Sequence, residues 1–162
     1  MTAPQLTVTE IRSPPERSQI CAEILDALPE WFGLADAFEA YVRDVADLPV
    51  LAVAAEDGSS AGFLAVKEHG MAAAEVYVMG VRRDLHGRGL GTALVAAAEE
   101  ALSARGFEYL QVKTLGPSHP SENYARTRAF YEARGFRPLE EIHGLWAEGN
   151  PCLVLVKHLR CR

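Results

Sequence analysis

Apolar residues recur along the chain with two periods, and each period predicts one kind of secondary structure. Seven short segments alternate apolar with polar residues or are largely apolar, as β-strands do. The second and third of them flank residues 56–59, whose Glu-Asp-Gly-Ser sequence favours a tight hairpin turn. The predicted strands cover residues 6–11, 50–55, 61–67, 75–81, 109–114, 140–146 and 152–159.

Four further segments place apolar residues three or four positions apart, which is the period of an amphipathic helix. Pro14 and Pro15 interrupt the chain before the first segment, and Ser121 can cap the start of the last. Gly106 and Gly135 follow the last two segments, where glycine commonly ends a helix. The predicted helices cover residues 16–28, 34–45, 92–104 and 121–134.

The order of these elements predicts the fold class. Strands gather in the middle of the chain and helices separate the later ones, which indicates an α+β (mixed α/β) fold. We expect a single domain over residues 1–162, with a central mixed, mostly antiparallel sheet of about seven strands and flanking helices. A chain of 162 residues, 49% of them hydrophobic, can bury one such core but not two. Residues 29–33, between the first two helices, are predicted to form a linker.

Composition narrows the range of partners. The formal net charge of −6 argues against general binding to nucleic acid, which requires a basic face, and it permits a cationic acceptor. No segment approaches the roughly 18–20 apolar residues of a membrane span. Residues 1–10 also lack the basic start and the apolar run of a signal peptide. We therefore expect a cytoplasmic protein that binds neither a membrane nor nucleic acid.

Cysteine and histidine residues give no sign of a metal site. The cysteines Cys21, Cys152 and Cys161 include no C-x-x-C pair and no spacing typical of zinc ligands. We expect free thiols and no bound metal. Four histidines lack metal-ligand spacing and are expected at the surface or in turns: His69, His119, His143 and His158.

A glycine-rich segment, residues 86–91, joins the fourth predicted strand to the third predicted helix. Its three glycines alternate with other residues, so the backbone can curl tightly or approach a ligand closely. The first amides of a helix have no intrahelical partner and lie at the positive end of its dipole. Such a segment favours binding of phosphate oxygens. Three arginines add positive charge around it: Arg82, Arg83 and Arg88.

Two common phosphate-binding motifs do not fit this segment. A P-loop requires Lys-Ser or Lys-Thr after the glycines, and neither is present. A dinucleotide fingerprint requires G-x-G-x-x-G directly after a strand, whereas the spacing here is G-x-G-x-G after five intervening residues. The acidic residue expected at the end of the next strand is also missing, because Glu108 precedes that strand. A glycine turn without a ligand remains the structural alternative.

Two motifs together resemble the GNAT acyltransferase superfamily. Val76, Met79 and Val81 followed by residues 83–91 are similar to motif A, in which Q/R-x-x-G-x-G/A binds the pyrophosphate of acetyl-CoA. His86 stands where the superfamily usually has Gln or Arg. Residues 129–136 resemble the superfamily segment A-x-x-F-Y-E-x-x-G-F, with one predicted strand between the two motifs. The order of elements matches as well, so the resemblance covers nearly the whole chain.

The resemblance implies that acetyl-CoA is the co-substrate. The backbone N–H of Val81 would donate to the thioester carbonyl in the manner of an oxyanion hole. Asn123 lies one position from the commonest register of a CoA-contacting asparagine, and Thr127 or Arg128 can occupy the equivalent space. The residues expected to bind acetyl-CoA are Met79, Gly80, Val81, Arg83, His86, Gly87, Arg88, Gly89, Leu90, Gly91, Thr92, Asn123, Thr127 and Phe130.

The resemblance also implies two catalytic residues. Glu75 lies at the spacing from the glycines where some histone acetyltransferases of the superfamily place a catalytic glutamate, and it would deprotonate the acceptor directly or through water. The alternative for Glu75 is a solvated residue at a strand start. Tyr131 lies where many members keep a tyrosine that protonates the CoA sulfur, and its alternative is core packing. Tyr124 lies seven residues earlier on the same helical face and can line the channel that holds CoA or the acceptor.

The acceptor is expected to be a primary amine of a small molecule, such as an amino acid, a polyamine-like compound or an antibiotic. An amine of a protein or peptide is the alternative, and so is a regulatory module that binds acyl-CoA without catalysis. Dimerisation is common in the superfamily, so a homodimer is also open, and the sequence fixes no interface. The residues expected to contact the acceptor are Trp31, Phe32, Tyr77 and Trp146.

Overall fold

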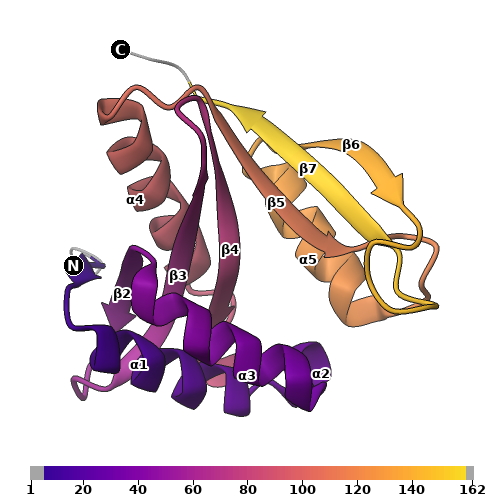
Figure 1. Ribbon diagram of the computed structural model, residues 1–162. Coiled ribbons are helices and arrows are strands. Elements are labelled where there is room, and N and C mark those ends of the chain that lie inside the picture. Colours follow the sequence, from indigo (N-terminus) through magenta and orange to yellow (C-terminus); the bar gives the residue numbers. More distant parts are fainter. Residues whose placement is uncertain (1–5, 160–162) are drawn as a thin grey trace. The chain divides into compact units, whose positions relative to one another are not determined.

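The computed structural model describes residues 6–159, and the chain divides into two compact units (Figure 1). Unit 1 consists of Met1–Lys67 and Val78–Ala101, and unit 2 consists of Glu68–Tyr77 and Leu102–Arg162. Strand β4 (Ala73–Val81) contributes its first half to unit 2 and its second half to unit 1. No helix among the described residues is long and apolar enough to cross a membrane.

Antiparallel strands form the sheet of unit 1. Strand β1 (Val8–Ile11) pairs with β2 (Val50–Ala54), which pairs with β3 (Ser60–His69). The turn between β2 and β3 contains Gly58 with a φ of 84°, which is a left-handed conformation that glycine adopts without strain. The predicted hairpin is thus present.

Four helices belong wholly or largely to unit 1: α1 (Pro14–Asp26), α2 (Pro29–Phe32), α3 (Ala35–Asp44) and α4 (Leu90–Ala104). Two short 3-10 turns, η1 (Val45–Asp47) and η2 (Arg83–Leu85), complete the unit. The buried residues of α1 are Ile20, Cys21, Ile24 and Leu25, which recur at helical spacing.

Two glycines let helices approach the sheet of unit 1 closely. A Cβ at Gly80 of β4 would lie 2.8 Å from Cγ2 of Ile24 on α1. A Cβ at Gly62 of β3 would lie 3.4 Å from Cδ1 of Leu94 on α4 and 3.1 Å from Cγ2 of Val81. Because successive side chains of a strand point to opposite faces, Gly80 and Val81 face different sides of the sheet. Helices α1 and α4 therefore cover opposite faces.

Unit 2 contains the parallel pair of the sheet. The first half of β4 runs parallel to β5 (Tyr109–Leu115), and Glu75 lies opposite Gln111 in the register. Strand β7 (Cys152–His158) is antiparallel to both β5 and β6 (Arg137–Ile142). The order of all seven strands is β1-β2-β3-β4-β5-β7-β6. The predicted mixed, mostly antiparallel sheet is confirmed.

Helix α5 (Glu122–Ala133) contacts β5 in unit 2, and Figure 1 shows it beside this strand. Its start is capped as predicted, because the side chain of Ser121 accepts a hydrogen bond from the amide of Tyr124. At its end Gly135 has a φ of 95°, and the amide of the buried Phe136 donates to the carbonyl of Tyr131 at 3.1 Å. This arrangement is a Schellman motif, in which glycine ends the helix as expected.

Two predicted boundaries are wrong in ways that matter for the site. Residues 29–33 are not a linker, because Pro29 begins the short helix α2 and the carbonyl of Leu28 accepts from the amides of Trp31 and Phe32. The strand predicted over residues 140–146 lies instead at Arg137–Ile142, so Trp146 is in a loop. Most residues of β6 are exposed, and its apolar pattern was therefore a poor guide to its position.

Other boundaries differ by one to three residues. Strand β1 is shorter than predicted, α1 and α4 both begin two residues earlier, and β3 continues to His69. Of the predicted free thiols, Cys21 and Cys152 are free and buried, and Cys161 lies outside the described residues.

Candidate active site

The glycine-rich segment of unit 1 forms an open turn at the start of α4. Gly87 and Gly89 have φ values of 75° and 82°, and no atom lies within 4 Å of the position that a Cβ would take at either residue. The first backbone hydrogen bond of the turn into α4 runs from the amide of Ala93 to the carbonyl of Gly89 at 3.0 Å. The amides of Leu90 and Gly91 precede this bond, at the positive end of a 15-residue helix. The turn therefore has the space and the polarity to receive an anion.

His86 connects this turn to the end of β4. Its Nε2 lies 2.7 Å from the carbonyl oxygen of Val81. A carbonyl oxygen can only accept, so Nε2 carries the hydrogen and donates it. The imidazole also meets the ring of Trp31 on α2 edge to face, with 6.0 Å between the ring centroids. The structure thus brings together two predicted site residues, His86 and Trp31.

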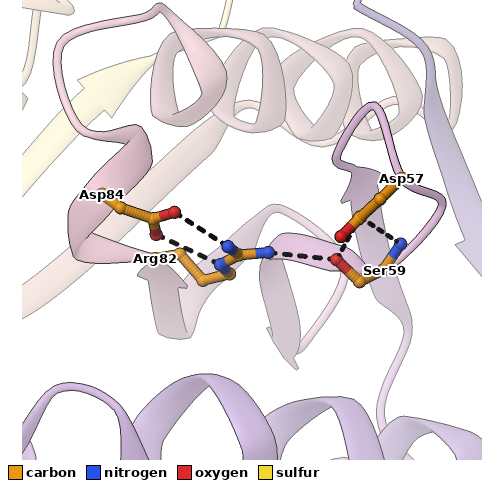
Figure 2. Close-up of polar contacts among 4 residues, drawn as sticks. All are labelled: Asp57, Ser59, Arg82 and Asp84. Atoms are coloured by element: carbon orange, nitrogen blue, oxygen red, sulfur yellow. Dashed lines mark hydrogen bonds and ion pairs between the residues drawn. The ribbon is translucent and has the colours of Figure 1, made fainter.

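Arg82 fixes the chain just before the turn (Figure 2). Its guanidinium donates to both carboxylate oxygens of Asp84, at 3.2 and 2.8 Å, and to Oγ of Ser59 at 3.0 Å. The hydroxyl and the amide of Ser59 donate to Asp57, at 2.5 and 2.9 Å. Hydrogen bonds from Ser59 lower the pKa of Asp57, and those from Arg82 lower the pKa of Asp84. Arg82 therefore connects the β2–β3 turn to η2, and its guanidinium donors are used within the protein.

The other two arginines near the turn differ in their partners. Arg83 forms an ion pair with Glu30 of α2, so its charge is balanced within the protein. Arg88 is exposed and makes no hydrogen bond or ion pair to any residue between 6 and 159. Among the three arginines, Arg88 is thus the one with no hydrogen bond or ion pair to a described residue, which leaves its donors open to an anionic ligand.

Two cavities of unit 1 lie near these residues. The larger has a volume of about 660 Å³, and its lining includes both partners of the Arg82–Asp84 pair. The smaller has a volume of about 240 Å³ and contains Phe32, one of the predicted acceptor residues, with Asp26 as its only charged side chain. The smaller cavity is lined by Leu25, Asp26, Pro29, Phe32, Gly33, Ala35 and Phe38.

Glu75 in unit 2 is buried within a polar cluster. Its Oε1 accepts hydrogen bonds from Nζ of Lys113 at 2.9 Å, from Nε2 of Gln111 at 3.0 Å and from Nε2 of His69 at 3.2 Å. Gln111 and Lys113 are two residues apart on β5, so their side chains share one face of the sheet. Glu75 is therefore not the solvated residue of the alternative interpretation.

Cys152 of β7 lies close enough to this cluster for electrostatic interaction. Burial raises the pKa of its thiol, the positive charge of Lys113 lowers it, and the negative charge of Glu75 raises it. The thiol is therefore uncharged at neutral pH, and Lys113 is the cation that balances the carboxylate of Glu75.

Tyr131 of unit 2 is buried on α5. Its ring contacts the rings of Phe130 and Phe136, with centroids 5.2 and 5.4 Å away. Burial raises the pKa of Tyr131 well above its ordinary value, so the hydroxyl keeps its proton at neutral pH. Core packing, the alternative for this residue, is thus present, and it is compatible with a hydroxyl that donates.

The remaining predicted residues of α5 make local contacts. Oγ1 of Thr127 donates to the carbonyl of Asn123 at 3.2 Å, one turn earlier in the helix. Arg128 donates to the carbonyl of Leu115 at 2.7 Å, at the end of β5. The guanidinium of Arg134 lies 5.4 Å from the centroid of the Phe130 ring. Arg128 is therefore partly committed to holding α5 on the sheet.

Sequence reasoning missed three partners of Glu75, namely His69, Gln111 and Lys113. His69 lies at the surface as expected, but it is the last residue of β3 and its Nε2 lies 3.2 Å from Oε1 of Glu75, a contact that the sequence did not indicate. The alternation of β5, with buried Leu110 and Val112 between polar residues, was the available signal for the other two. Among the described residues, no group of three His, Cys, Asp or Glu is placed to hold a metal ion.

Comparisons with known proteins agree with the fold. Residues 48–138, more than half of the chain, match the family described as "Acetyltransferase (GNAT) domain". A mycothiol acetyltransferase of Beutenbergia cavernae is 40% identical over 83 residues, which cover 51% of this chain and 26% of that protein. The matched region therefore spans about a quarter of that relative's length. The chain belongs to the GNAT family of N-acetyltransferases, which are acyltransferases that use acetyl-CoA.

Solved structures share the fold over almost the whole chain. An aminoglycoside 6'-N-acetyltransferase complexed with coenzyme A superposes with a TM-score of 0.75 at 17% identity, over 96% of this chain and 98% of that one. The ribosomal-protein-S18-alanine N-acetyltransferase of Escherichia coli gives the same TM-score at 15% identity, over 96% of this chain and 94% of that one. At these identities the likeness concerns the fold.

Proposed function

We propose that the protein transfers the acetyl group of acetyl-CoA directly to a primary amine of a small molecule. The observation that carries the proposal is the open turn of Gly87 and Gly89 before α4, within the region that matches the family. The choice of a small molecule is supported by the sequence relative from Beutenbergia, which is named for mycothiol.

The residues of the turn fit the phosphates of acetyl-CoA. The amides of Leu90, Gly91 and Thr92 would donate to the pyrophosphate, with the guanidinium of Arg88 beside them. A Cβ at Gly87 or Gly89 would both strain the backbone and enter the space that the phosphates need. Acetyl-CoA itself supplies an acyl group activated as a thioester.

The end of β4 would hold the thioester through its backbone. The amide of Val81 donates to the carbonyl oxygen and stabilises the negative charge that develops there. Gly80 allows α1 to pack closely on this strand, and its contribution to acetyl-CoA binding comes from its main chain. Met79 and Val81 are half-buried and occupy the other face of the same strand.

Two proton transfers complete the reaction. The ammonium of the acceptor must lose a proton before its nitrogen can attack, and the cluster around Glu75 performs this step. The departing CoA sulfur needs a proton, which the hydroxyl of Tyr131 donates. Trp31 and Phe32 on α2, with Tyr77 on β4 and Trp146 in the loop after β6, are the residues proposed to contact the acceptor.

A primary amine of a protein or peptide is the second candidate acceptor. The equal TM-scores of the aminoglycoside enzyme and of the ribosomal-protein enzyme favour neither class over the other. A matched panel of small amines and of peptides with free N-termini or lysines decides between them, with product mass as the readout. We expect an increase of one acetyl group on a small amine. Acetylation confined to peptides would replace the first candidate by the second.

A module that binds acyl-CoA without catalysis is the third candidate, and it is distinguished by comparing binding with turnover. Such a module would show a thermal shift with acetyl-CoA and no release of thiol with any amine.

A further inference from the structure

We propose that His69 is the group that accepts the proton of the acceptor ammonium, and that Glu75 positions His69 instead of taking this proton itself. The proposal rests on the acetyl transfer proposed above and assigns the residue for one of its steps. His69 is the last residue of β3, and Glu75 is the third residue of β4. A three-residue turn, residues 70–72, joins the two strands.

The hydrogen bond between the two residues determines which ring nitrogen can accept. Nε2 of His69 lies 3.2 Å from Oε1 of Glu75. An ionised carboxylate only accepts hydrogen bonds, so Nε2 carries the hydrogen and Nδ1 of the neutral ring keeps its lone pair. The side chain of His69 is 35% exposed and that of Glu75 is 7% exposed. Nδ1, the nitrogen that can accept a proton, therefore belongs to the more accessible residue of the pair. The carboxylate of Glu75 orients the ring through its hydrogen bond with Nε2.

The hydrogen bonds to Glu75 suit a carboxylate that stays in place and orients a neighbouring side chain. Three donors converge on Oε1: the ammonium of Lys113, the amide of Gln111 and the imidazole of His69. These contacts hold the carboxylate in place beside the imidazole. Histidine is the side chain that most often accepts a proton in general base catalysis.

The titratable groups placed against Glu75 come from three strands. His69 comes from β3, Lys113 from β5 and Cys152 from β7. Lys113 supplies the positive charge and the Cys152 thiol is neutral at the working pH, because burial raises its pKa. His69 is thus the group of this cluster that changes charge in the step.

The protons of the reaction balance through His69. The ammonium gives one proton to Nδ1, directly or through a water molecule, and its nitrogen keeps the electron pair that attacks the acetyl carbonyl. The imidazolium holds its Nε2–H toward Glu75 and releases the Nδ1 proton to solvent. The second proton of the amine replaces the proton that the hydroxyl of Tyr131 gives to the CoA sulfur. An ammonium and acetyl-CoA thus yield an amide, the CoA thiol and one free proton.

The first test replaces His69 with glutamine. The His69→Gln side chain can still donate to Glu75 but cannot carry a proton. We expect kcat to fall by about 10²–10⁴-fold, the factor that general base catalysis contributes, while KM for acetyl-CoA stays unchanged. The rise of kcat with pH on the acidic side should disappear. In His69→Ala, added imidazole should restore part of the lost rate, which a purely structural role would not allow.

The matched control is His158, another histidine at the end of a strand of unit 2. Its ring contacts Tyr109, with 5.4 Å between the centroids, and it has no place in the proposed machinery. We expect His158→Ala to keep the wild-type kcat and pH profile. Melting temperatures of all variants show whether each has folded.

Glu75→Gln separates the two members of the pair. If Glu75 positions His69, kcat falls in this variant. The rise of kcat with pH persists but shifts to lower pH, because the imidazolium has lost the carboxylate beside it. If Glu75→Gln abolishes this rise while His69→Gln keeps both the rise and the wild-type kcat, Glu75 takes the proton itself and the proposal is overturned.

The tautomer of His69 gives a readout that does not depend on turnover. Long-range ¹H–¹⁵N spectra of the wild-type protein with labelled histidine should show hydrogen on Nε2 and none on Nδ1 near pH 8. Hydrogen on Nδ1 would overturn the proposal. The expected tautomer in a protein that releases no thiol with any amine would instead contradict the proposed function, and the role of His69 with it.

Discussion

His86 donates a hydrogen bond from Nε2 to the carbonyl oxygen of Val81 at 2.7 Å, and this bond closes the segment that leads from β4 into the glycine turn. Val81 is the residue whose amide is proposed to hold the thioester carbonyl. The same imidazole contacts Trp31 of α2. His86 therefore connects the strand end, the turn and α2 within unit 1, which explains how histidine can serve where the family commonly has glutamine or arginine.

Replacing His86 tests this connection. We expect His86→Ala to weaken acetyl-CoA binding about two- to tenfold, because a net hydrogen bond contributes about 0.5–1.5 kcal/mol. His86→Gln should retain most of the affinity, since its side-chain amide can donate to the same carbonyl. Titration calorimetry with acetyl-CoA measures both variants. Equal affinities of the alanine variant and the wild type would show that the bond does not shape the turn.

The glycine turn can be tested with a control glycine of almost the same φ. Gly89 and Gly58 have φ values of 82° and 84°, and neither has an atom within 4 Å of a Cβ position. Alanine at either residue should lower the free energy of unfolding by about 1–2 kcal/mol, because both conformations are left-handed. Only Gly89→Ala should also lose acetyl-CoA affinity. Comparable losses of affinity in both variants would mean that the effect is general destabilisation.

Tyr131→Phe removes the proposed proton donor and keeps the ring between Phe130 and Phe136. We expect kcat to fall at least tenfold with little change in melting temperature, whereas Tyr109→Phe, at an exposed tyrosine of β5, should be neutral. Because burial raises the pKa of Tyr131, the wild type should show no alkaline loss of activity from this group near its ordinary pKa. Unchanged turnover in Tyr131→Phe would show that Tyr131 does not donate the proton and serves only in core packing.

Cys21 makes stability depend on alkaline pH. Burial on α1 raises the pKa of its thiol to about 12, whereas the thiol of the unfolded chain ionises near 9. Between these values the unfolded chain loses a proton that the native protein keeps, so rising pH favours unfolding. The contribution is complete below about pH 9 and is lost progressively toward pH 12, by up to about 1.4 kcal/mol per pH unit.

Urea unfolding at pH 8 and pH 10.5 measures this dependence. Cys152 and Tyr131 act in the same direction, so the slope of the wild type alone does not isolate Cys21. We expect Cys21→Ala to be less stable than the wild type at pH 8 and to lose less stability on going to pH 10.5. Equal losses in the two proteins would show that Cys21 ionises equally in both states.

The fold class and the glycine turn could be predicted from the sequence because both depend on local signals. Alternating strands, periodic helices and terminating glycines such as Gly106 and Gly135 are short-range features, and the structure confirms them. Residues 29–33 were predicted wrongly because Pro29 can end a segment or begin a helix, and only the surrounding backbone decides which.

The partners of Glu75 could not be predicted in the same way. Lys113 and Gln111 reach Glu75 because β4 and β5 pair in parallel with Glu75 opposite Gln111, and register between strands distant in sequence is not a local property. His69 reaches it because β3 extends two residues beyond its predicted end. A glutamate that resembled an exposed strand residue is for these reasons buried, with three donors on its Oε1.

Release of the CoA thiol reports acetyl transfer from acetyl-CoA to an amine, the activity proposed for this chain. Thiol should appear at a rate that saturates with the concentration of a small primary amine, in equal amount to an acetylated product identified by mass. Without amine the release should be negligible. Thiol release at the same slow rate with and without every amine tested would contradict this activity.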